Sequence, residues 1–201
     1  SSILLNSGKC RQRVLEHAPE RRFDYIGVFL RISSLFCSAP KTYFSGTCLT
    51  KHSICNFPHD MSDQLLWTDA KTHARIEESG TMNAMFVLNG KIITPKTSTS
   101  ILPGITRDSI LTIARDWGYE VEERDVMVAE LKNGLKNGTL TEAFGVGTAA
   151  TIAHISEIGI GGKDYKLPSI ESREFSNKMA SYLNNLKRGR ENDTNNWLFK
   201  V

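Results

Sequence analysis

Two groups of residues have side chains that could do chemistry. Cysteine and histidine alternate at Cys48, His52, Cys55 and His59, and thiolates and imidazoles are zinc ligands. The ligand pairs of structural zinc sites are usually separated by a longer loop, so the spacing favours free thiols and predicts no metal. The second group is Glu77-Glu78, directly before an apolar stretch. A carboxylate at a strand entrance can face a site or lie in solvent, and spacing leaves both alternatives open.

Glycine-containing turns are a further kind of candidate site, because they leave backbone N–H groups unpaired. Residues 103–106, PGIT, lead into a helical pattern, and the start of a helix can hold a phosphate. Most helix starts bind nothing, so this turn alone does not establish a ligand. Residues 144–150, FGVGTAA, form a small-residue loop whose two glycines allow close approach to a ligand or to another strand.

Alternating strands and helices must position these candidates. Residues 84–88 and 91–94 are apolar and flank Asn89-Gly90, the pair favoured in a type I′ turn, so we expect a hairpin. Apolar spacing predicts helices over 106–117, with Thr106 as N-cap and Gly118 after the last turn, and over 175–186. The other expected elements are a strand or short buried helix at 26–30, strands at 65–67, 121–128 and 151–158, a helix at 129–137 and a turn at 159–162. This interleaving indicates an α/β or α+β fold.

The composition is ordinary for a soluble globular protein but uneven along the chain. The 201 residues have a net charge of +3, which gives no reason to expect nucleic acid, and no apolar run approaches the roughly 18 residues of a membrane span. Residues 1–64 hold all four cysteines and eight Lys or Arg against five Asp or Glu, whereas residues 65–201 hold 17 of each. No export signal is recognisable, so we expect a cytoplasmic protein, and the first residue, Ser1, suggests a fragment or a processed product.

Three motifs, in order along the chain, resemble the branched-chain amino acid aminotransferases, which are class IV pyridoxal phosphate enzymes. They are ESGTMN at 78–83, ILPGITR at 101–107 and EAFGVGTAA at 142–150. Residues 63–69 and the ending from 187 to 197 are similar to that family too, so the resemblance covers residues 63–201. It implies the large C-terminal α/β (α+β) domain of the D-amino acid aminotransferase-like enzymes. We expect that domain to be incomplete, because its first strands should precede residue 63.

The resemblance also implies a pyridoxal 5′-phosphate cofactor and a role for each matched residue. Glu78 matches the catalytic carboxylate that pairs with the pyridine nitrogen. Leu102 matches the residue against the ring face, and Ile105 and Thr106 match the turn that holds the phosphate. In the loop, Gly147 and Thr148 are implied for the cofactor, and Thr148 and Ala149 for the substrate carboxylate. The implied reaction exchanges an amino group between leucine, isoleucine or valine and 2-oxoglutarate, in a homodimer.

The chain departs from the family pattern at the Schiff-base lysine. In the family this lysine precedes Gly-Asn-Tyr, a tripeptide that the sequence does not contain, and Lys41 is followed by other residues. We therefore expect Lys41 and Lys51 to be surface groups, and residues 1–62 to be an unmatched, irregular or aberrant segment. Two alternatives to an active aminotransferase remain. One is a degenerate, inactive fragment without the lysine, and the other is a zinc-binding adaptor built on residues 48–59.

Overall fold

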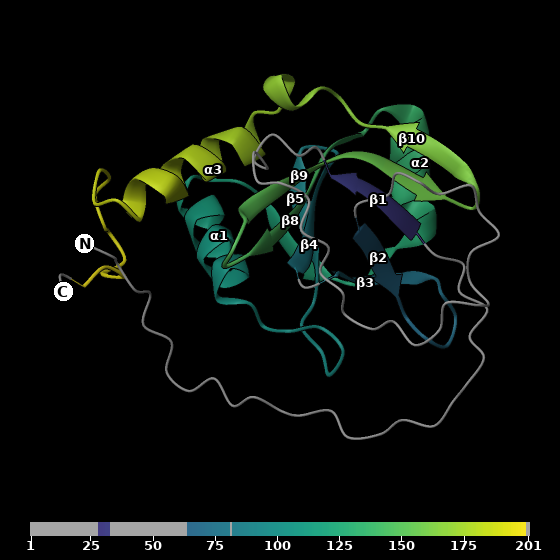
Figure 1. The fold of residues 1–201 in the computed structure, drawn as a ribbon, viewed down its shortest axis with the longest axis horizontal. Helices are drawn as coiled ribbons and strands as arrows, with labels where there is room; N and C mark the ends of the chain where they lie inside the picture. The colour runs from purple at the N-terminus through teal and green to yellow at the C-terminus, as the bar shows by residue number, and fades with distance from the viewer. Residues whose placement is uncertain (1–27, 33–63, 81, 200–201) are drawn as a thin grey trace, which may run out of the picture.

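A computed structural model describes residues 28–32, 64–80 and 82–199, and within these ranges ten strands form one curled sheet (Figure 1). The strands are β1 Val28–Ile32, β2 Gln64–Thr68, β3 Arg75–Ser79, β4 Met82–Leu88, β5 Lys91–Pro95, β6 Val121–Arg124, β7 Val126–Met127, β8 Leu140–Gly147, β9 Thr151–Ile160 and β10 Lys163–Lys166. The helices are α1 Ile105–Asp116, α2 Val128–Asn137 and α3 Phe175–Leu186, with a 3-10 turn η1 at Ile170–Ser172. The mixed α/β class expected from the sequence is confirmed.

The sheet has the strand order β6-β5-β4-β8-β9-β1-β2-β3-β7, with β10 beside β9. An additional pairing of β3 with β4 closes the middle of this path on itself. Most neighbours are antiparallel, and β5 with β6 is a parallel pair. The longest helices in the described part of the chain have 12 residues, fewer than a membrane span needs.

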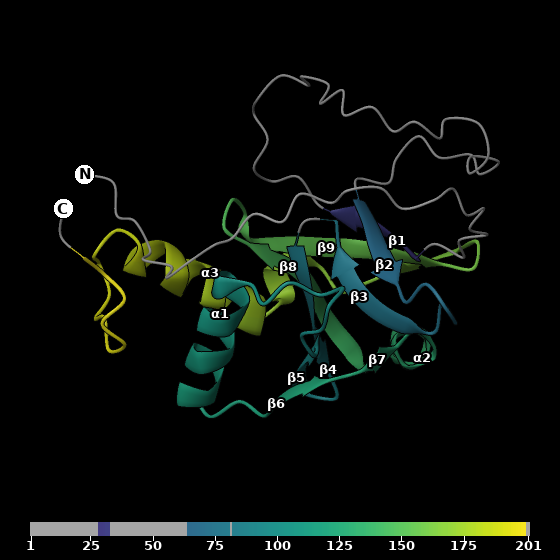
Figure 2. The ribbon, with the colours of Figure 1, turned by 90° about the horizontal axis from the view of Figure 1, so that it is seen from below.

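Strand β4 separates two apolar cores, because successive side chains of a strand point to opposite faces. Met85 and Val87 pack with residues of α1 and α3, whereas Ala84, Phe86 and Leu88 belong to a core enclosed by the curled sheet and α2. Helices α1 and α3 accordingly lie at one side of the sheet and α2 at the other (Figure 2). Asn83 has the parity of Met85, so it lies on the face that α1 and α3 cover.

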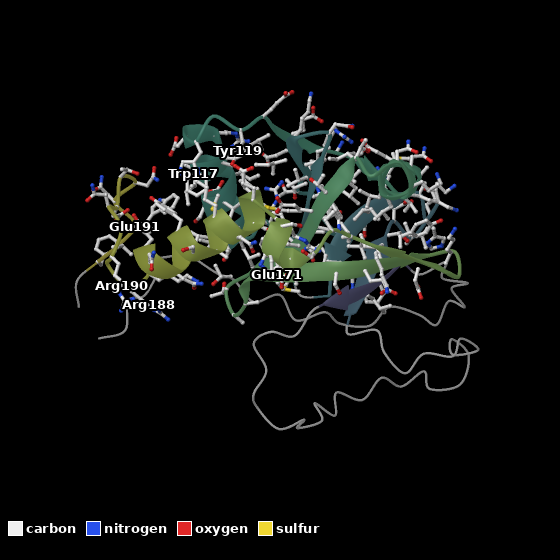
Figure 3. The ribbon with its side chains drawn as sticks, turned by 90° about the horizontal axis from the view of Figure 1, so that it is seen from above. Trp117, Tyr119, Glu171, Arg188, Arg190 and Glu191 are labelled. Carbon is white, nitrogen blue, oxygen red and sulfur yellow. The ribbon has the colours of Figure 1, made fainter. Side chains whose placement is uncertain are left out.

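Aromatic side chains join α1 to α3 at the end of α1 farthest from its start. Trp117 and Tyr119 follow the last turn of α1 and lie beside α3 (Figure 3). Their rings meet those of Tyr182 and Phe175 edge to face, at centroid distances of 5.3 and 5.0 Å. Such pairs stabilise beyond their buried area, so they help to fix the direction of both helices.

Several predicted elements are confirmed. Asn89 and Gly90 have φ of 52° and 76°, as a type I′ hairpin between β4 and β5 requires. Gly118 follows α1 with φ of 81°, and α3 covers the predicted helix. The predicted strand at 65–67 is the middle of β2.

Other boundaries predicted from the sequence are wrong. The N-cap of α1 is Gly104, whose carbonyl accepts from Asp108, so Thr106 lies inside the helix and forms no side-chain cap. The strand predicted at 121–128 is two strands that separate at Asp125, because β6 pairs with β5 and β7 with β3. Residues 144–147 belong to β8, which leaves only Thr148–Ala150 as the loop, and β9 continues to Ile160, beyond the predicted end at 158.

One strand of the sheet comes from before residue 63. β1 lies between β2 and β9 and pairs with both in antiparallel register, with Phe29 opposite Leu65 and Gly159. The sheet is therefore continuous across a position where we expected strands to be missing. Lys41, Lys51 and the cysteine and histidine group at 48–59 lie outside the described residues.

Candidate active site

The hydrogen-bond register places Glu78 in a row of opposed residues that crosses four strands. Glu78 of β3 lies opposite Asn83 of β4, Asn83 lies opposite Val146 of β8, and Val146 lies opposite Ile152 of β9. Adjacent strands are about 4.8 Å apart, so Glu78 and Val146 are about 10 Å apart across the sheet. Directly opposed residues share a face, so this row borders the side of the sheet that α1 and α3 cover.

The Glu78 carboxylate is held by one of its two oxygens. Oε1 accepts the backbone N–H of Leu102 at 2.5 Å and the side-chain amide of Asn83 at 3.1 Å. The same amide nitrogen of Asn83 donates to the carbonyl of Leu102 at 2.8 Å. Among the described residues, Oε2 has no hydrogen-bond partner. The turn at Leu102 is thus fixed to the carboxylate, while the second oxygen is left for a ligand.

Burial changes the acidity of this carboxylate. Partial burial disfavours the charged form and raises the pKa of Glu78 above its ordinary value of 4.5. The Leu102 N–H acts in the opposite direction, and the charge of neighbouring Glu77 adds to the increase. A cationic group beside Oε2 would offset the cost of burying this charge.

The start of α1 lies next to Asn83 and has no side-chain cap. Gly104 is the N-cap, with an extended backbone at φ −70° and ψ 134°. A Cβ at Gly104 would lie 2.2 Å from Oδ1 of Asn83, so only glycine allows this approach. The N–H groups of the first turn have no partner within a helix, and here no side chain caps them. Ile105 and Thr106 therefore offer N–H groups to an anion.

Two apolar side chains beside these polar groups are exposed. Leu102 is 68% exposed and Ile105 is 48% exposed, whereas Thr106 is buried. An isolated exposed leucine is unremarkable. Here, however, the backbone of Leu102 bonds to the Glu78 carboxylate, and the exposed side chain offers a surface that a flat ligand could cover.

The loop at Thr148–Ala150 joins β8 to β9 at the other end of the row. Thr148 and Ala149 are exposed, and Gly147 is half-buried. Gly145, one residue before Val146, has no room for a side chain, since a Cβ would lie 2.8 Å from Cε of Met82. Small residues in this motif thus serve the packing of β8 against β4. Across the described ranges, the N–H groups of Thr148 and Ala149 donate no hydrogen bond to a loop or side-chain acceptor.

The residues predicted from the sequence form two groups. In the first, Glu78 bonds directly to Leu102. Ile105 and Thr106 belong to it because they follow Gly104, which lies against Asn83. Gly147, Thr148 and Ala149 are placed near them by strand register alone. Within the described ranges, no three His, Cys, Asp or Glu side chains gather so that they could hold a metal ion.

Sequence reasoning missed two residues, Asn83 and Gly104. Asn83 stands in the motif at 78–83, but no role was assigned to it. The available signal was its separation of five residues from Glu78 across Gly80, which has φ of 57°. A reversal at that glycine makes the two residues antiparallel neighbours with side chains on one face.

The groups around Glu78 fit a pyridoxal phosphate. A carboxylate oxygen without a partner suits a protonated ring nitrogen, and the exposed side chain of Leu102 suits a ring face. Uncapped N–H groups at the start of α1 suit a phosphate. Asn83 links these three features, because its side chain bonds to the carboxylate and to the turn at Leu102 and lies against Gly104 at the start of α1.

Comparisons with known proteins show which family the chain resembles. Residues 60–158 match the sequence model of the family described as amino-transferase class IV. A probable branched-chain-amino-acid aminotransferase of Staphylococcus aureus (strain N315) is 43% identical over 135 residues, which are 67% of this chain and 38% of that protein.

Solved structures give the same result. The branched-chain aminotransferase of the thermophilic archaea Thermoproteus uzoniensis, solved with norvaline, has a TM-score of 0.56 and 28% identity, over 69% of this chain and 41% of that one. The branched-chain amino acid aminotransferase of Thermobaculum terrenum, solved in PLP-form (holo-form), has a TM-score of 0.53 and 29% identity, over 69% of this chain and 41% of that one.

The chain thus spans 38% of the length of the Staphylococcus aureus relative. The match to the family begins at residue 60, just before β2, and the structural likeness covers 69% of the chain. From residue 60 onward, this chain belongs to the class IV aminotransferases.

Proposed function

We propose that this chain is part of a pyridoxal 5′-phosphate-dependent enzyme that exchanges an amino group between leucine, isoleucine or valine and 2-oxoglutarate. It would act as a homodimer in the cytoplasm. The observation that supports this most is the Glu78 carboxylate, one oxygen of which is fixed by Leu102 and Asn83 while the other has no partner among the described residues. The names of the relatives support the choice of branched-chain substrates.

Each predicted residue has a place in this function. Glu78 Oε2 would accept the N–H of the ring nitrogen, and the Leu102 side chain would pack against the ring. Ile105 and Thr106 donate backbone N–H groups to the phosphate, together with Gly147 and Thr148. Thr148 and Ala149 orient the substrate carboxylate. When bound, the cofactor supplies an electron sink for the carbanion at the substrate Cα.

The protein's part in the chemistry is positioning and charge. Glu78 keeps the ring nitrogen protonated, and its contact with the Leu102 N–H holds it in place before a ligand arrives. Glu78, whose pKa is raised by burial, would be stabilised in its charged form by a cation beside Oε2. Leu102 and Ile105 exclude water from the ring face, which strengthens the interaction between Glu78 and the ring nitrogen.

Binding of pyridoxamine 5′-phosphate tests the cofactor site directly, since this probe needs no lysine. We expect protein fluorescence to titrate with it at an affinity at least about tenfold higher than with pyridoxamine, which lacks the phosphate. Glu78→Gln should weaken both ligands, because both contain the ring nitrogen. Equal affinities for the two probes would contradict a phosphate site at the start of α1.

The degenerate, inactive fragment remains a second candidate, because the sequence lacks the Gly-Asn-Tyr that follows the family's lysine. Incubation with pyridoxal 5′-phosphate and borohydride, followed by peptide mass mapping, separates the two candidates. An active enzyme should carry the label on a single lysine and should convert leucine with 2-oxoglutarate. Pyridoxamine 5′-phosphate binding without a labelled lysine would instead identify the inactive scaffold.

A further inference from the structure

A half-buried lysine contacts the base of the Thr148–Ala150 loop. Lys187 caps the C-terminal end of α3 and donates from Nζ to Oγ1 of Thr151 at 2.5 Å. No carboxylate of the described residues forms an ion pair with it, and burial lowers its pKa. Because a partly desolvated ammonium is unfavourable without acceptors, the Thr151 hydroxyl is an important partner for it.

Thr151 has a backbone conformation that β-branched residues rarely adopt. Its φ is 59°, in the left-handed region, and its side chain is buried. Such a conformation persists only where the surrounding structure holds it. Thr151 pairs with Gly147 across the hairpin, and Ile152 donates to the Ala150 carbonyl at 2.7 Å. Lys187 supplies the side-chain hydrogen bond that reaches Thr151 from outside the hairpin.

Helix α3 is itself fixed to the sheet at its other end. The Glu142 carboxylate of β8 accepts the backbone N–H groups of Phe175 and Ser176 at 3.0 and 2.8 Å. Arg173, just before α3, donates to the carbonyls of Ala143 and Ile155 at 3.2 and 2.7 Å. The helix is thus anchored to β8 and β9 at its start and contacts the base of their connecting loop from its end.

We propose that Lys187 is a positioning residue for the Thr148–Ala150 loop. By holding Thr151 in the left-handed conformation, it sets the direction of the backbone N–H groups of Thr148 and Ala149. The ammonium of Lys187 also places a positive charge beside Thr151, directly after the loop. This charge favours an anion on the loop. The identity of that anion, a phosphate or a substrate carboxylate, rests on the proposed function, whereas the effect on loop order does not.

Order parameters of the backbone amides in the ligand-free protein test the positioning role. Lys187→Met and Thr151→Val each remove the hydrogen bond, one from the donor and one from the acceptor. In both variants we expect the order parameters of Thr148–Thr151 to fall from about 0.85 to below about 0.6. The double variant should give the same loss as either single one. Lys187→Arg should preserve much of the order.

A matched control is Lys136→Met, which removes a lysine from the last turn of α2 and should leave the loop unchanged. Thermal unfolding shows whether each variant is folded, and Thr151→Val carries the test if Lys187→Met does not fold. A loop that stays rigid in a folded variant without the hydrogen bond would overturn the proposal.

Ligand binding then separates this proposal from the proposed function. Lys187→Met should lower the affinity for pyridoxamine 5′-phosphate about tenfold, because the phosphate would lose about one hydrogen bond from the loosened loop. The affinity for pyridoxamine, which has no phosphate, should be nearly unchanged. If the wild-type protein binds neither probe but its loop loosens in the variants, the cofactor assignment fails and the positioning role stands. Unchanged phosphate affinity with a loosened loop would overturn the link between loop order and a bound phosphate.

Discussion

At the scale of single residues, the two oxygens of Glu78 have separate tasks. Oε1 fixes the turn at Leu102, and we propose that Oε2, which has no hydrogen-bond partner in the part of the chain that the structure describes, accepts from a cationic ligand. The charge of the carboxylate therefore influences both the stability of the folded chain and the binding of a ligand. Because burial raises the pKa of Glu78, both effects should change with pH in the same range.

The sign of the stability effect follows from proton binding. Between the ordinary pKa of 4.5 and the raised pKa of the folded state, the folded protein binds more protons than the unfolded one. The contribution of Glu78 to the free energy of unfolding therefore falls as pH rises through this window and is constant on either side. Affinity for pyridoxamine 5′-phosphate should rise through the same window, because the ionised carboxylate binds the ring nitrogen.

Urea unfolding and ligand titration over this pH range test both slopes in Glu78→Gln. The pH dependence that Glu78 gives to stability and to affinity should disappear in this variant. The control Glu171→Gln, on the exposed turn η1, should retain both pH dependences. The glutamine retains an oxygen for the Leu102 N–H, so we expect the variant to remain folded. An unchanged pH dependence in Glu78→Gln would mean that another group titrates.

The resemblance of the motifs to a known family implied candidate site residues such as Glu78 and Thr106, but the sequence did not indicate how they are connected. Asn83 acts through a register between β3 and β4, and its side-chain oxygen Oδ1 is near Gly104, which is 21 residues away. Such a contact depends on where two segments meet in space. The error at Thr106 has the same origin, because Gly104 begins the helix in a position set by its contact with Asn83.

At the scale of the elements, α1 and β4 are joined by a contact that tolerates no added atom. Gly104→Ala would place its Cβ 2.2 Å from Oδ1 of Asn83, so that either the backbone of residue 104 or the Asn83 side chain would have to move. We expect a loss of about 1–3 kcal/mol in the free energy of unfolding, as for other overpacked positions, with weaker binding of pyridoxamine 5′-phosphate. Asn83→Ala should create room, so the double variant should lose less than the sum of the single ones. Additive losses in denaturant unfolding would contradict this contact.

Strands β8 and β9 and the start of α3 meet around His154. Burial and the charge of Arg173 lower the pKa of His154, against a smaller opposing effect of Glu142, and its Nδ1 is buried without a partner among the described residues. The unfolded chain therefore binds more protons than the folded one just below the ordinary pKa of 6.5. The contribution of His154 to stability should fall as pH is lowered from 6.5 through the folded-state pKa.

Thermal unfolding at a series of pH values can isolate this contribution. His154→Gln removes the titrating ring and should flatten the part of the profile directly below pH 6.5. Its slope is opposite in sign to that of Glu78, so the two variants should change the profile in opposite directions. A profile that is unaltered in His154→Gln would show that this histidine is protonated equally in both states.

At the scale of the whole molecule, the sheet includes a strand that sequence reasoning placed in the unmatched segment 1–62. Apolar residues predicted a strand or short helix near 26–30, and the structure places β1 at Val28–Ile32. Its location between β2 and β9 was not predictable, because pairing across more than 120 residues leaves no local pattern. The charge and cysteine asymmetry at residue 64 therefore gives no guide to which residues join the sheet.

The central location of β1 makes it sensitive to loss of a backbone donor. Phe29 lies opposite Leu65 on one side and Gly159 on the other, so proline at this position removes an N–H within a strand that has neighbours on both sides. We expect Phe29→Pro to cost about 3 kcal/mol or more in the free energy of unfolding. The opened edges of β2 and β9 should promote aggregation, measurable by light scattering.

The matched control is Thr99→Pro, in the exposed segment before α1, which should change neither the free energy of unfolding nor the light scattering appreciably. If Phe29→Pro were as stable and as monodisperse as that control, β1 could not be the strand that joins the two halves of the sheet.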